Sequence, residues 1–447
     1  MAASSQLNVA VIGGGFTGLT AARRLAKSGL CKVSLIERGP ALGGLAGGFT
    51  IQGTSLEKAY HHIFRSDQDI RQLVEELGLS ARLQWHESSI GIYYGGHIYS
   101  FMSPADVLRF KPCNLFNRFR LGAVAFYLQK SRRWRWFASQ SAYHWMRRFS
   151  GKQATNVIWG PLLRGKFHSH YDSVSMAWLW KRIHMRGNSR ESAGAEKLGY
   201  FQGGFSVVTD ALAAELKNAG ATILLNTRVE RLNIDSGAPT LFLNGAAQRF
   251  DRCLFTGPSG ALSDLLNGVP GLEEYRRKLE SISYLGAINL VFATDQTLGD
   301  YYWLNINDPA APFLVFVRHT RLVDPARYSG KQIYYIGSYQ PHESPLFAMP
   351  EAELTNLWFD YLQKIYPYFD RSKILEKHLF KFRHAQHVVD LDYESKIPAS
   401  RTPVAGVYLS NFSQVFPEDR GTNFAVRDGN NVADLILKDI NLERHHA

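Results

Sequence analysis

The sequence predicts an α/β protein with two large domains, separate or interleaved. The first observation behind this prediction is the length, because 447 residues exceed what one compact core usually holds. The second is a short buried-strand pattern, Leu7–Ile12, that runs directly into a glycine-rich turn and then a helical pattern. The third is the set of apolar or alternating strand patterns at 284–292, 313–318 and 332–339, which would form a second sheet.

The glycine-rich turn has the spacing G-x-G-x-x-G. Gly13, Gly15 and Gly18 occupy the three glycine positions, and Phe16 and Thr17 lie between the last two. The first glycine permits a tight turn out of the strand, the second lets the backbone approach a diphosphate, and the third allows close packing of helix on sheet. A helical pattern over Leu19–Ser28 follows at once, so the turn has the strand–turn–helix context that the motif requires.

An acidic residue closes the next predicted strand. The pattern Lys32–Ile36 ends at Glu37, where a carboxylate can accept hydrogen bonds from both ribose hydroxyls of an adenosine. The free N–H groups at the start of the helix would hold the phosphates. A carboxylate at this position disfavours a 2′-phosphate and therefore NADP. The sequence thus predicts a dinucleotide site rather than a chance glycine loop.

The residues after Glu37 favour FAD over NAD. Arg38 follows directly, and a second glycine turn, Gly43-Gly44-Leu45, comes a few residues later. This arrangement resembles FAD proteins of the glutathione-reductase-type fold, in the group that includes flavin amine oxidases, protoporphyrinogen oxidases and phytoene desaturases. In that group the second turn lies against the FAD phosphates and the flavin. No second strand–G-x-G-x-x-G–helix unit follows, so no built-in NAD(P)H domain is evident.

The resemblance continues along the chain. The segment with Tyr60, His61 and His62 corresponds to the one that passes the flavin ring, and His62-Ile63-Phe64 also resembles a segment of UDP-galactopyranose mutases. Val229 corresponds to an adenine contact, and the helix from Gly421 to about Lys438 to one that points at the flavin. The residues so assigned to FAD are Gly13, Gly15, Phe16, Thr17, Gly18, Glu37, Arg38, Gly43, Gly44, Leu45, Tyr60, His61, His62, Val229, Gly421, Thr422 and Asn423.

The resemblance also implies interleaved domains: a Rossmann-type FAD-binding domain and an α+β substrate domain. The expected FAD-binding domain comprises residues 1–65, 200–262 and 398–447. The expected substrate domain comprises 66–199, which is largely helical and contains a basic aromatic segment at 107–171, and 263–397.

The candidates for chemistry are few, because a flavin moves hydride itself and needs position and electrostatics from the protein. His61 and His62 are candidates for poising the flavin or moving a proton, with a packed histidine pair as the structural alternative. Arg164 is a candidate for binding an anionic substrate group, with a plain salt bridge as its alternative. His168 and His170 alternate as in a strand and His384 and His387 have helical spacing, but no ligand set is completed, so we expect no metal.

A basic aromatic segment without acidic residues lies between Asp106 and Asp172. It carries thirteen Lys and Arg residues, against a net charge of +12 for the whole chain, interleaved with many aromatic rings. Asn114 is expected to cap a helix over 115–129 on which Leu115, Phe119 and Phe126 share a face. Residues 107–152 are therefore expected to associate with an anionic membrane surface. A solvated helical face is the alternative, and nucleic acid is not expected because no recognisable nucleic-acid-binding fold accompanies the segment.

Together these features predict an FAD-dependent oxidoreductase, a dehydrogenase, desaturase or oxidase, that takes hydride from a largely apolar, lipid or isoprenoid molecule. The first alternative is a redox-neutral isomerase of a nucleotide sugar, like UDP-galactopyranose mutase, and the second is an amine oxidase. Three scattered cysteines and the absence of a long apolar run predict a cytoplasmic protein, peripheral at the membrane face. The electron acceptor and the oligomeric state stay open.

Overall fold

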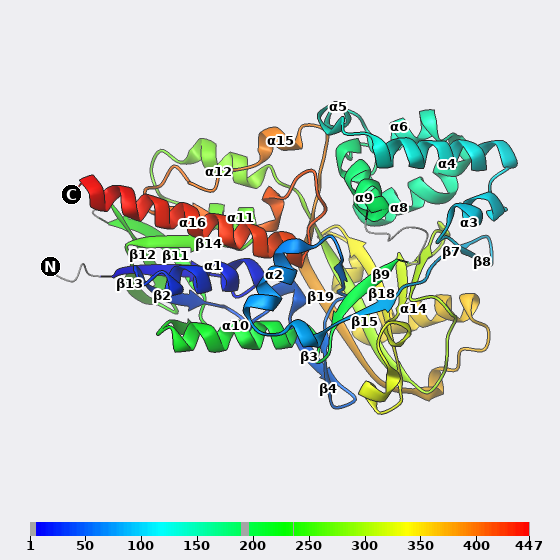
Figure 1. Cartoon of the computed structure of the whole chain (residues 1–447), viewed down its shortest axis with the longest axis horizontal. Coiled ribbons are helices and arrows are strands. Elements are labelled where there is room, and N and C mark those ends of the chain that lie inside the picture. Colours follow the sequence, from blue (N-terminus) through cyan, green and yellow to red (C-terminus); the bar gives the residue numbers. More distant parts are fainter. Residues whose placement is uncertain (1–5, 189–195, 236, 447) are drawn as a thin grey trace.

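The computed structural model describes residues 6–188, 196–235 and 237–446. Two sheet-containing bodies lie side by side, and a group of helices lies beside the second body, at the opposite end of the molecule from both chain termini (Figure 1). Sheets and helices are mixed and the first sheet is parallel, which confirms the predicted α/β class. In the described part of the chain, no helix combines the length and apolarity needed to cross a membrane.

The first body is built on a five-stranded parallel sheet in the order β10-β2-β1-β14-β20. Its strands are β1 (Leu7–Ile12), β2 (Cys31–Ile36), β10 (Thr222–Leu224), β14 (Arg252–Phe255) and β20 (Val407–Leu409). These strands come from three distant parts of the chain, all within the ranges expected for the first domain. The domain boundaries themselves stay a prediction.

Both faces of this sheet are buried, as the apolar run of β1 predicts. Val9 and Val11 face one core, which is covered by α1 (Phe16–Lys27), α10 (Ser206–Asn218) and α16 (Thr422–His446). Ala10 and Ile12 face another, which includes residues of α11 (Ser259–Leu265), α12 (Glu273–Glu280) and an antiparallel sheet. That sheet contains β11 (Val229–Asp235), β12 (Ala238–Leu243) and β13 (Ala246–Arg249).

The apolar pattern at 222–232 suggests one strand, but the structure divides it between two sheets. β10 ends at Leu224, and β11 begins at Val229 in the antiparallel sheet. Asn226, between them, has a φ of +51°, the left-handed region in which asparagine is tolerated better than most residues. The resulting turn brings the start of β11 next to the end of β2.

The second body contains a seven-stranded sheet in the order β19-β15-β18-β17-β16-β7-β8. One face packs against α14 (Glu351–Ile365) around Trp358, while the other face contributes Val315, Ile333 and Tyr335 to the core shared with β1 and α1. The two bodies therefore share one core. The strands are β7 (Ile90–Tyr94), β8 (His97–Ser100), β15 (Tyr284–Thr294), β16 (Trp303–Ile306), β17 (Val315–Arg318), β18 (Gln332–Gln340) and β19 (Ile374–His387).

A group of helices follows β8 in the chain and includes the basic aromatic segment (Figure 1). It consists of α3 (Pro104–Arg109), α4 (Leu115–Lys130), α5 (Trp134–Ala138), α6 (Ala142–Phe149), α7 (Lys152–Ala154), α8 (Gly160–Phe167) and α9 (Met176–Asn188). Asn114 caps α4 as expected, because its Oδ1 accepts from the Asn117 N–H at 2.9 Å. His168 and His170 lie in a short 3-10 turn rather than a strand, whereas His384 and His387 lie in β19 rather than a helix.

The remaining helices and strands are α2 (Gln68–Glu76), α13 (Pro345–Ala348), α15 (Tyr393–Lys396), the hairpin β3 (Gly48–Ile51) and β4 (Thr54–Glu57), and a small sheet of β5 (Ile63–Phe64), β6 (Leu83–Glu87) and β9 (Lys197–Phe201). β4 and β5 flank residues 58–62, so these pairings hold the segment that contains Tyr60, His61 and His62 at the junction of the two bodies.

Candidate functional site

In the first glycine turn, Gly13 and Gly18 have no space for a side chain, whereas Gly15 has open space beside it. Gly13 has a φ of +112°, and a Cβ there would lie 2.3 Å from Thr256 Oγ1. A Cβ on Gly18 would lie 1.9 Å from the Gly13 carbonyl oxygen. A Cβ on Gly15, in contrast, would contact only Gly44 Cα, at 3.9 Å. Gly13 and Gly18 are thus required by the fold itself, whereas Gly15 leaves free space in front of the backbone.

The second glycine turn lies directly against the first. The Gly43 N–H donates to the Gly14 carbonyl at 2.8 Å, and Gly15 and Gly43 form a parallel β-bridge. A Cβ on Gly44 would lie 3.1 Å from Gly15 Cα. Leu45 follows in a short 3-10 turn and is half-buried. Two bare backbone turns therefore meet at the carboxyl end of β1.

Glu37 lies at the carboxyl end of β2 and binds both neighbouring turns. Its Oε2 accepts from the Gly14 N–H and its Oε1 from the Gly39 N–H, each at 2.7 Å. A carboxylate has about four lone-pair positions, so further donors can still be bound. The Thr227 N–H donates to the Glu37 carbonyl at 3.0 Å, which places Val229 two residues from this contact. Arg38 is exposed.

The start of α1 offers free N–H groups to an anion. Gly15 occupies the N-cap with no side-chain cap, and no acidic residue lies in the first turn. The first N–H groups of a helix have no partner within it and carry a partial positive charge. Phe16 is buried against Phe205, with ring centres 6.4 Å apart, and Thr17 is half-buried. The open space at Gly15, these N–H groups and the Glu37 carboxylate fit the adenosine diphosphate half of a dinucleotide.

His61 is a neutral imidazole at pH 7. Burial, helped by the nearby Arg420 guanidinium and opposed by the hydrogen bond to Ala59, lowers the pKa of His61 to about 4. Its Nδ1 lies 2.7 Å from the Ala59 carbonyl oxygen, so the neutral ring donates from Nδ1 and keeps Nε2 as an acceptor. The prediction that His61 or His62 moves a proton or poises the flavin is untested. The geometry adds that His61 could serve as a hydrogen-bond acceptor near neutral pH.

His62 and Tyr60 lie among aromatic rings of the second body. His62 Nδ1 is 3.0 Å from the Tyr302 hydroxyl, and its ring meets Trp303 edge to face. Tyr60 also meets Trp303 edge to face, at 4.9 Å between ring centres, and it packs against Tyr335. Burial raises the pKa of Tyr60 well above its ordinary value, so its hydroxyl stays protonated. Tyr60, His61 and His62 are thus held in fixed orientations and each remains partly accessible.

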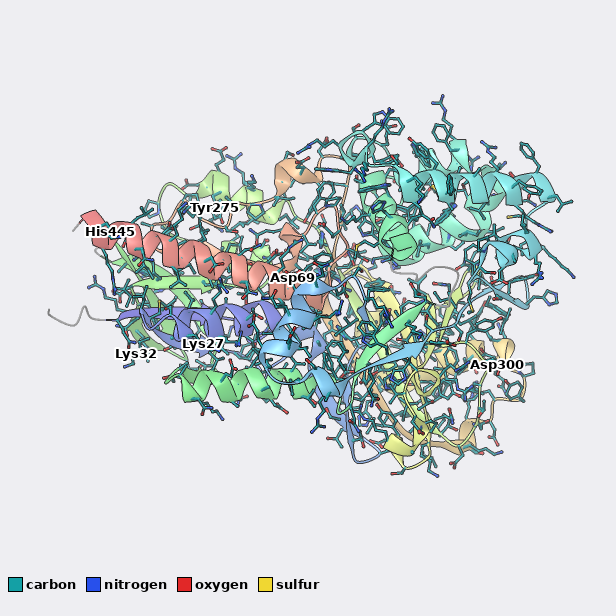
Figure 2. All side chains as sticks on the ribbon, in the orientation of Figure 1. Lys27, Lys32, Asp69, Tyr275, Asp300 and His445 are labelled. Atoms are coloured by element: carbon teal, nitrogen blue, oxygen red, sulfur yellow. The ribbon has the colours of Figure 1, made fainter. Side chains whose placement is uncertain are left out.

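The start of α16 is tied to α2. Asn423 accepts from the Ile70 N–H and donates to Asp69, both at 3.1 Å, so its side chain is occupied by α2. Figure 2 shows Asp69 on α2 beside the end of α16 where the helix begins. Gly421 is exposed and Thr422 half-buried. The assignment of Gly421, Thr422 and Asn423 to the cofactor stays a prediction. Because the Asn423 side chain is bound to α2, only the backbone of Asn423 is available for a contact with the cofactor.

The contacts of Arg164 are with two tyrosines of the helical group rather than with His61 or His62. It is an exposed residue of α8 whose Nη2 donates to the Tyr143 hydroxyl at 3.2 Å. Its guanidinium also lies 4.7 Å from the centre of the Tyr171 ring. In the part of the chain that the structure describes, no hydrogen bond, ion pair or ring contact joins it to His61 or His62. Its role as an anion-binding residue stays a prediction.

A buried charged cluster, which the sequence did not single out, lies two residues further along α8. Lys166 Nζ is 2.7 Å from Asp419 Oδ2, and Arg182 from α9 binds the same oxygen. Arg420 Nη2 donates to the Tyr339 hydroxyl at 3.0 Å. We call Lys166, Arg182, Asp419 and Arg420 the Asp419 cluster. The only sequence signal was that Glu418 and Asp419 precede Gly421, whereas the cations looked like any others of a basic segment.

The Asp419 cluster lies close to the segment of Tyr60 and His61. Burial, opposed by Asp419 and increased by Arg182 and Arg420, lowers the pKa of Lys166 to about 7. The three surrounding cations hold the pKa of Asp419 far below its usual range despite burial. The positive charge of Arg420 affects the pKa values of both Tyr60 and His61. Residues 60–61, the end of β18 and the loop before α16 therefore converge on one place.

Among the described residues, no group of three or more His, Cys, Asp or Glu side chains could hold a metal ion. The three cysteines are buried thiols, and burial raises the pKa of each. The candidate chemistry of the described chain therefore rests on the glycine turns, residues 60–62 and the Asp419 cluster.

Comparisons with known proteins agree with this geometry. The chain resembles solved structures across nearly its whole length: a protein from Exiguobacterium assigned to protoporphyrinogen oxidase (17% identity, 97% and 99% of the two chains, TM-score 0.77), and a reduced UDP-galactopyranose mutase (14%, 97% and 96%, 0.75). Putrescine oxidase gives 17% identity, 97% and 99% coverage and a TM-score of 0.73. At these identities the likeness concerns the fold.

Sequence relatives include the chloroplastic or chromoplastic 15-cis-phytoene desaturase of Arabidopsis thaliana, 23% identical over 90% of this chain and 75% of that protein. A carotenoid phi-ring synthase of Streptomyces griseus is 36% identical over 18% of each chain. The model of the flavin containing amine oxidoreductase family matches residues 16–437, which is nearly the whole chain. FAD is accordingly the cofactor that the glycine turns fit. The protein is an FAD-dependent oxidoreductase, and the chain belongs to the flavin containing amine oxidoreductase family.

Proposed function

We propose that this oxidoreductase takes a largely apolar lipid or isoprenoid substrate from an anionic membrane surface, which it contacts through residues 107–152. The observation that carries the proposal is the exposure of large apolar side chains on α4. Leu115, Phe116, Phe119 and Phe126 are 63%, 72%, 64% and 63% exposed. Leu121 and Leu128 are the buried residues of this helix. The expected face of Leu115, Phe119 and Phe126 is therefore turned away from the core.

The same surface carries uncompensated positive charge. Arg109, Lys111, Lys130, Arg132, Arg133, Arg135, Arg148 and Lys152 are exposed. No acidic residue lies between Asp106 and Asp172 to pair with them. Arg118 and Arg120 bind backbone carbonyls of the helical group instead. Exposed rings beside exposed cations suit the headgroup region of a membrane with anionic lipids, where each cation contributes about 1 kcal/mol. A purely solvated helix would not need to leave four large apolar side chains uncovered.

The relatives support the apolar class of substrate. Phytoene and carotenoids, from which two sequence relatives take their names, are largely apolar isoprenoids. The same proposal assigns residues 1–65, 200–262 and 398–447 to FAD binding, and 66–199 and 263–397 to substrate binding. When bound, FAD supplies the acceptor for a hydride from a substrate carbon. The chain itself would contribute the Gly15 and Gly44 backbone to the diphosphate, the fixed rings of Tyr60 and His62, and the neutral His61.

The function is tested with FAD-loaded protein under anaerobic conditions. Addition of polyprenyl and carotenoid precursor lipids is expected to bleach the oxidised flavin, with a dehydrogenated product in mass spectrometry. Conversion of UDP-galactopyranose by the reduced protein, with no net change in flavin oxidation state, would instead establish the isomerase alternative. Bleaching by alkylamines but by no lipid would establish the amine oxidase alternative and refute the apolar substrate.

Membrane contact is tested with a triple variant, Phe116→Ser, Phe119→Ser and Phe126→Ser. Each ring would lose about 1.5 kcal/mol of burial in the interface, about 4.5 kcal/mol for the three, so partitioning onto vesicles with anionic lipid should fall by about 1,000-fold or more. A flotation assay with phosphatidylcholine vesicles, with and without phosphatidylglycerol, measures the change. Tyr368→Ser is the matched control, because Tyr368 is 61% exposed but lies outside the segment. Equal binding of the triple variant and the wild type would contradict the proposal.

A further inference from the structure

We propose that the Asp419 cluster binds an oxyanion group of the substrate, so that the substrate is an amphiphile with a phosphate or carboxylate head. This inference rests on the proposed function and specifies its substrate class. The cluster brings three cations to one carboxylate, since Lys166, Arg182 and Arg420 surround Asp419. The neighbouring Lys181 is neutralised by Glu418 at 3.2 Å. Asp419 offsets one of these cations, so the cluster keeps an excess of between one and two positive charges near pH 7, where Lys166 titrates.

A buried donor in the cluster lacks an acceptor. Arg420 Nε is buried within a half-buried side chain and has no hydrogen-bond partner among the described residues. An arginine nitrogen can only donate, so an acceptor oxygen has to come from a ligand or from water. Asp419 Oδ1 is likewise without a partner in the described chain, and it would accept from a water or a hydroxyl that accompanies the bound group. Buried groups of this kind are normally paired in a functioning protein.

The surroundings of the cluster fit a head group rather than a structural ion pair. Lys166 is buried against the rings of Trp178 and Tyr339, at 5.0 and 5.5 Å from their centres. The side chains of Arg182 and Asp419 are 25% and 19% exposed, so the cluster remains accessible. A phosphate monoester carries about 1.5 to 2 negative charges near neutral pH, which is close to the positive excess of the cluster. A carboxylate, with one negative charge, would neutralise only part of that excess.

The position of the Asp419 cluster agrees with the path that an amphiphilic substrate would take from the membrane to residues 60–62. The cluster combines α8 and α9 of the helical group with the loop that enters α16, beside Tyr60 and His61. The exposed apolar surface of α4 belongs to the same helical group, and α4 packs against α9. A substrate that arrives from the membrane through this group would meet the cluster next to residues 60–62.

The test uses FAD-loaded protein, so that the dinucleotide site is filled, and titrates inorganic phosphate, pyrophosphate and acetate by calorimetry and by the flavin spectrum. Arg182→Gln and Lys166→Met should weaken phosphate binding by about tenfold or more, since each removes one charge-assisted hydrogen-bond donor. Asp419→Asn should strengthen phosphate binding, because it removes the negative charge that competes with the ligand. Lys331→Gln, which removes a cation paired with Asp295 on the surface, is the control and should change nothing.

The expected effects have opposite signs, since Arg182→Gln and Lys166→Met should weaken phosphate binding and Asp419→Asn should strengthen it. Misfolding would weaken binding in all three variants, so it cannot imitate this result. Preferred binding of phosphate indicates a phosphate head, and preferred binding of acetate a carboxylate head. Absence of saturable binding, or equal binding by all variants, would overturn the inference. Loss of FAD from Arg182→Gln and Lys166→Met would also overturn it by assigning the cluster to the cofactor. Lipids that bleach the flavin although no anion binds would refute only the head group, whereas anion binding without bleaching by any lipid would refute the proposed function.

Discussion

Replacing Gly15 with valine is expected to abolish FAD binding while the protein stays folded. Gly15 has a φ of −77° and a ψ of 177°, which other residues adopt without strain. A Cβ there would contact only Gly44 Cα, at an ordinary van der Waals distance of 3.9 Å, so the Cβ itself fits the protein. It would occupy the space in which a diphosphate approaches the N–H groups of α1. Loss of these contacts, about 4 kcal/mol or more, corresponds to an affinity lower by about 1,000-fold.

Two measurements separate this effect from misfolding. The flavin content of the purified protein should fall to background, while the far-ultraviolet circular dichroism spectrum stays that of the wild type. Gly260→Val is the matched control, because a Cβ at this position of α11 has no atom within 4 Å and lies outside the predicted FAD contacts. Retention of stoichiometric FAD by Gly15→Val would show that the diphosphate does not lie at this turn.

Replacing Glu57 with leucine is expected to lower the free energy of unfolding by about 4 kcal/mol. Glu57 is 1% exposed, and its carboxyl group binds the Tyr200 hydroxyl and the Phe205 N–H, each at 2.6 Å. Each buried group left without its partner costs about 1–3 kcal/mol. Burial raises the pKa of Glu57, so a neutral amide should replace the carboxyl group well. Glu57 ends β4 and directly precedes residues 58–62. The change should therefore also increase the mobility of the segment that contains Tyr60, His61 and His62.

Glu57→Gln is therefore the matched control and should cost no more than about 1 kcal/mol, because an amide can still accept from the Phe205 N–H and donate to Tyr200. Urea unfolding followed by tryptophan fluorescence, on FAD-loaded protein in excess FAD, measures both variants. Equal destabilisation by leucine and glutamine would show that the buried hydrogen bonds contribute little, and that the carboxylate charge matters instead.

The glycine turns were predictable because their chemistry is local. Gly13, Gly15 and Gly18 act through backbone conformation and the missing Cβ, both of which a short motif specifies within one strand–turn–helix unit. The resemblance placed Gly43 and Gly44 against the FAD phosphates, whereas their contact with Gly15 is tertiary and was not predicted. The strand break at Asn226 was missed because the apolar pattern on both sides suits a strand, and the choice between two sheets is made by packing.

The difference between Arg164 and Lys166 illustrates what local pattern leaves undecided. Both are cations of α8, and two residues along an α-helix turn a side chain by about 200°. One of them must therefore face outward when the other faces inward, but the sequence does not say which. The structure turns Arg164 to the surface, between Tyr143 and Tyr171, and buries Lys166 against Asp419. The partner lies 253 residues away in the chain, so no short-range pattern could connect them.

The amino-acid sequence alone determined the fold class, the dinucleotide cradle and the basic aromatic character of residues 107–171, because each depends on residue type at short spacing. The tertiary structure alone decided which side of α4 stays uncovered, which cation of α8 is buried, and how residues 60–62 meet the loop before α16. Those outcomes depend on the burial of apolar and charged side chains between segments that are far apart in the chain, from tens of residues for α4 and α9 to hundreds for Lys166 and Asp419. Burial of that kind is a property of the packed whole and cannot be read from any single segment.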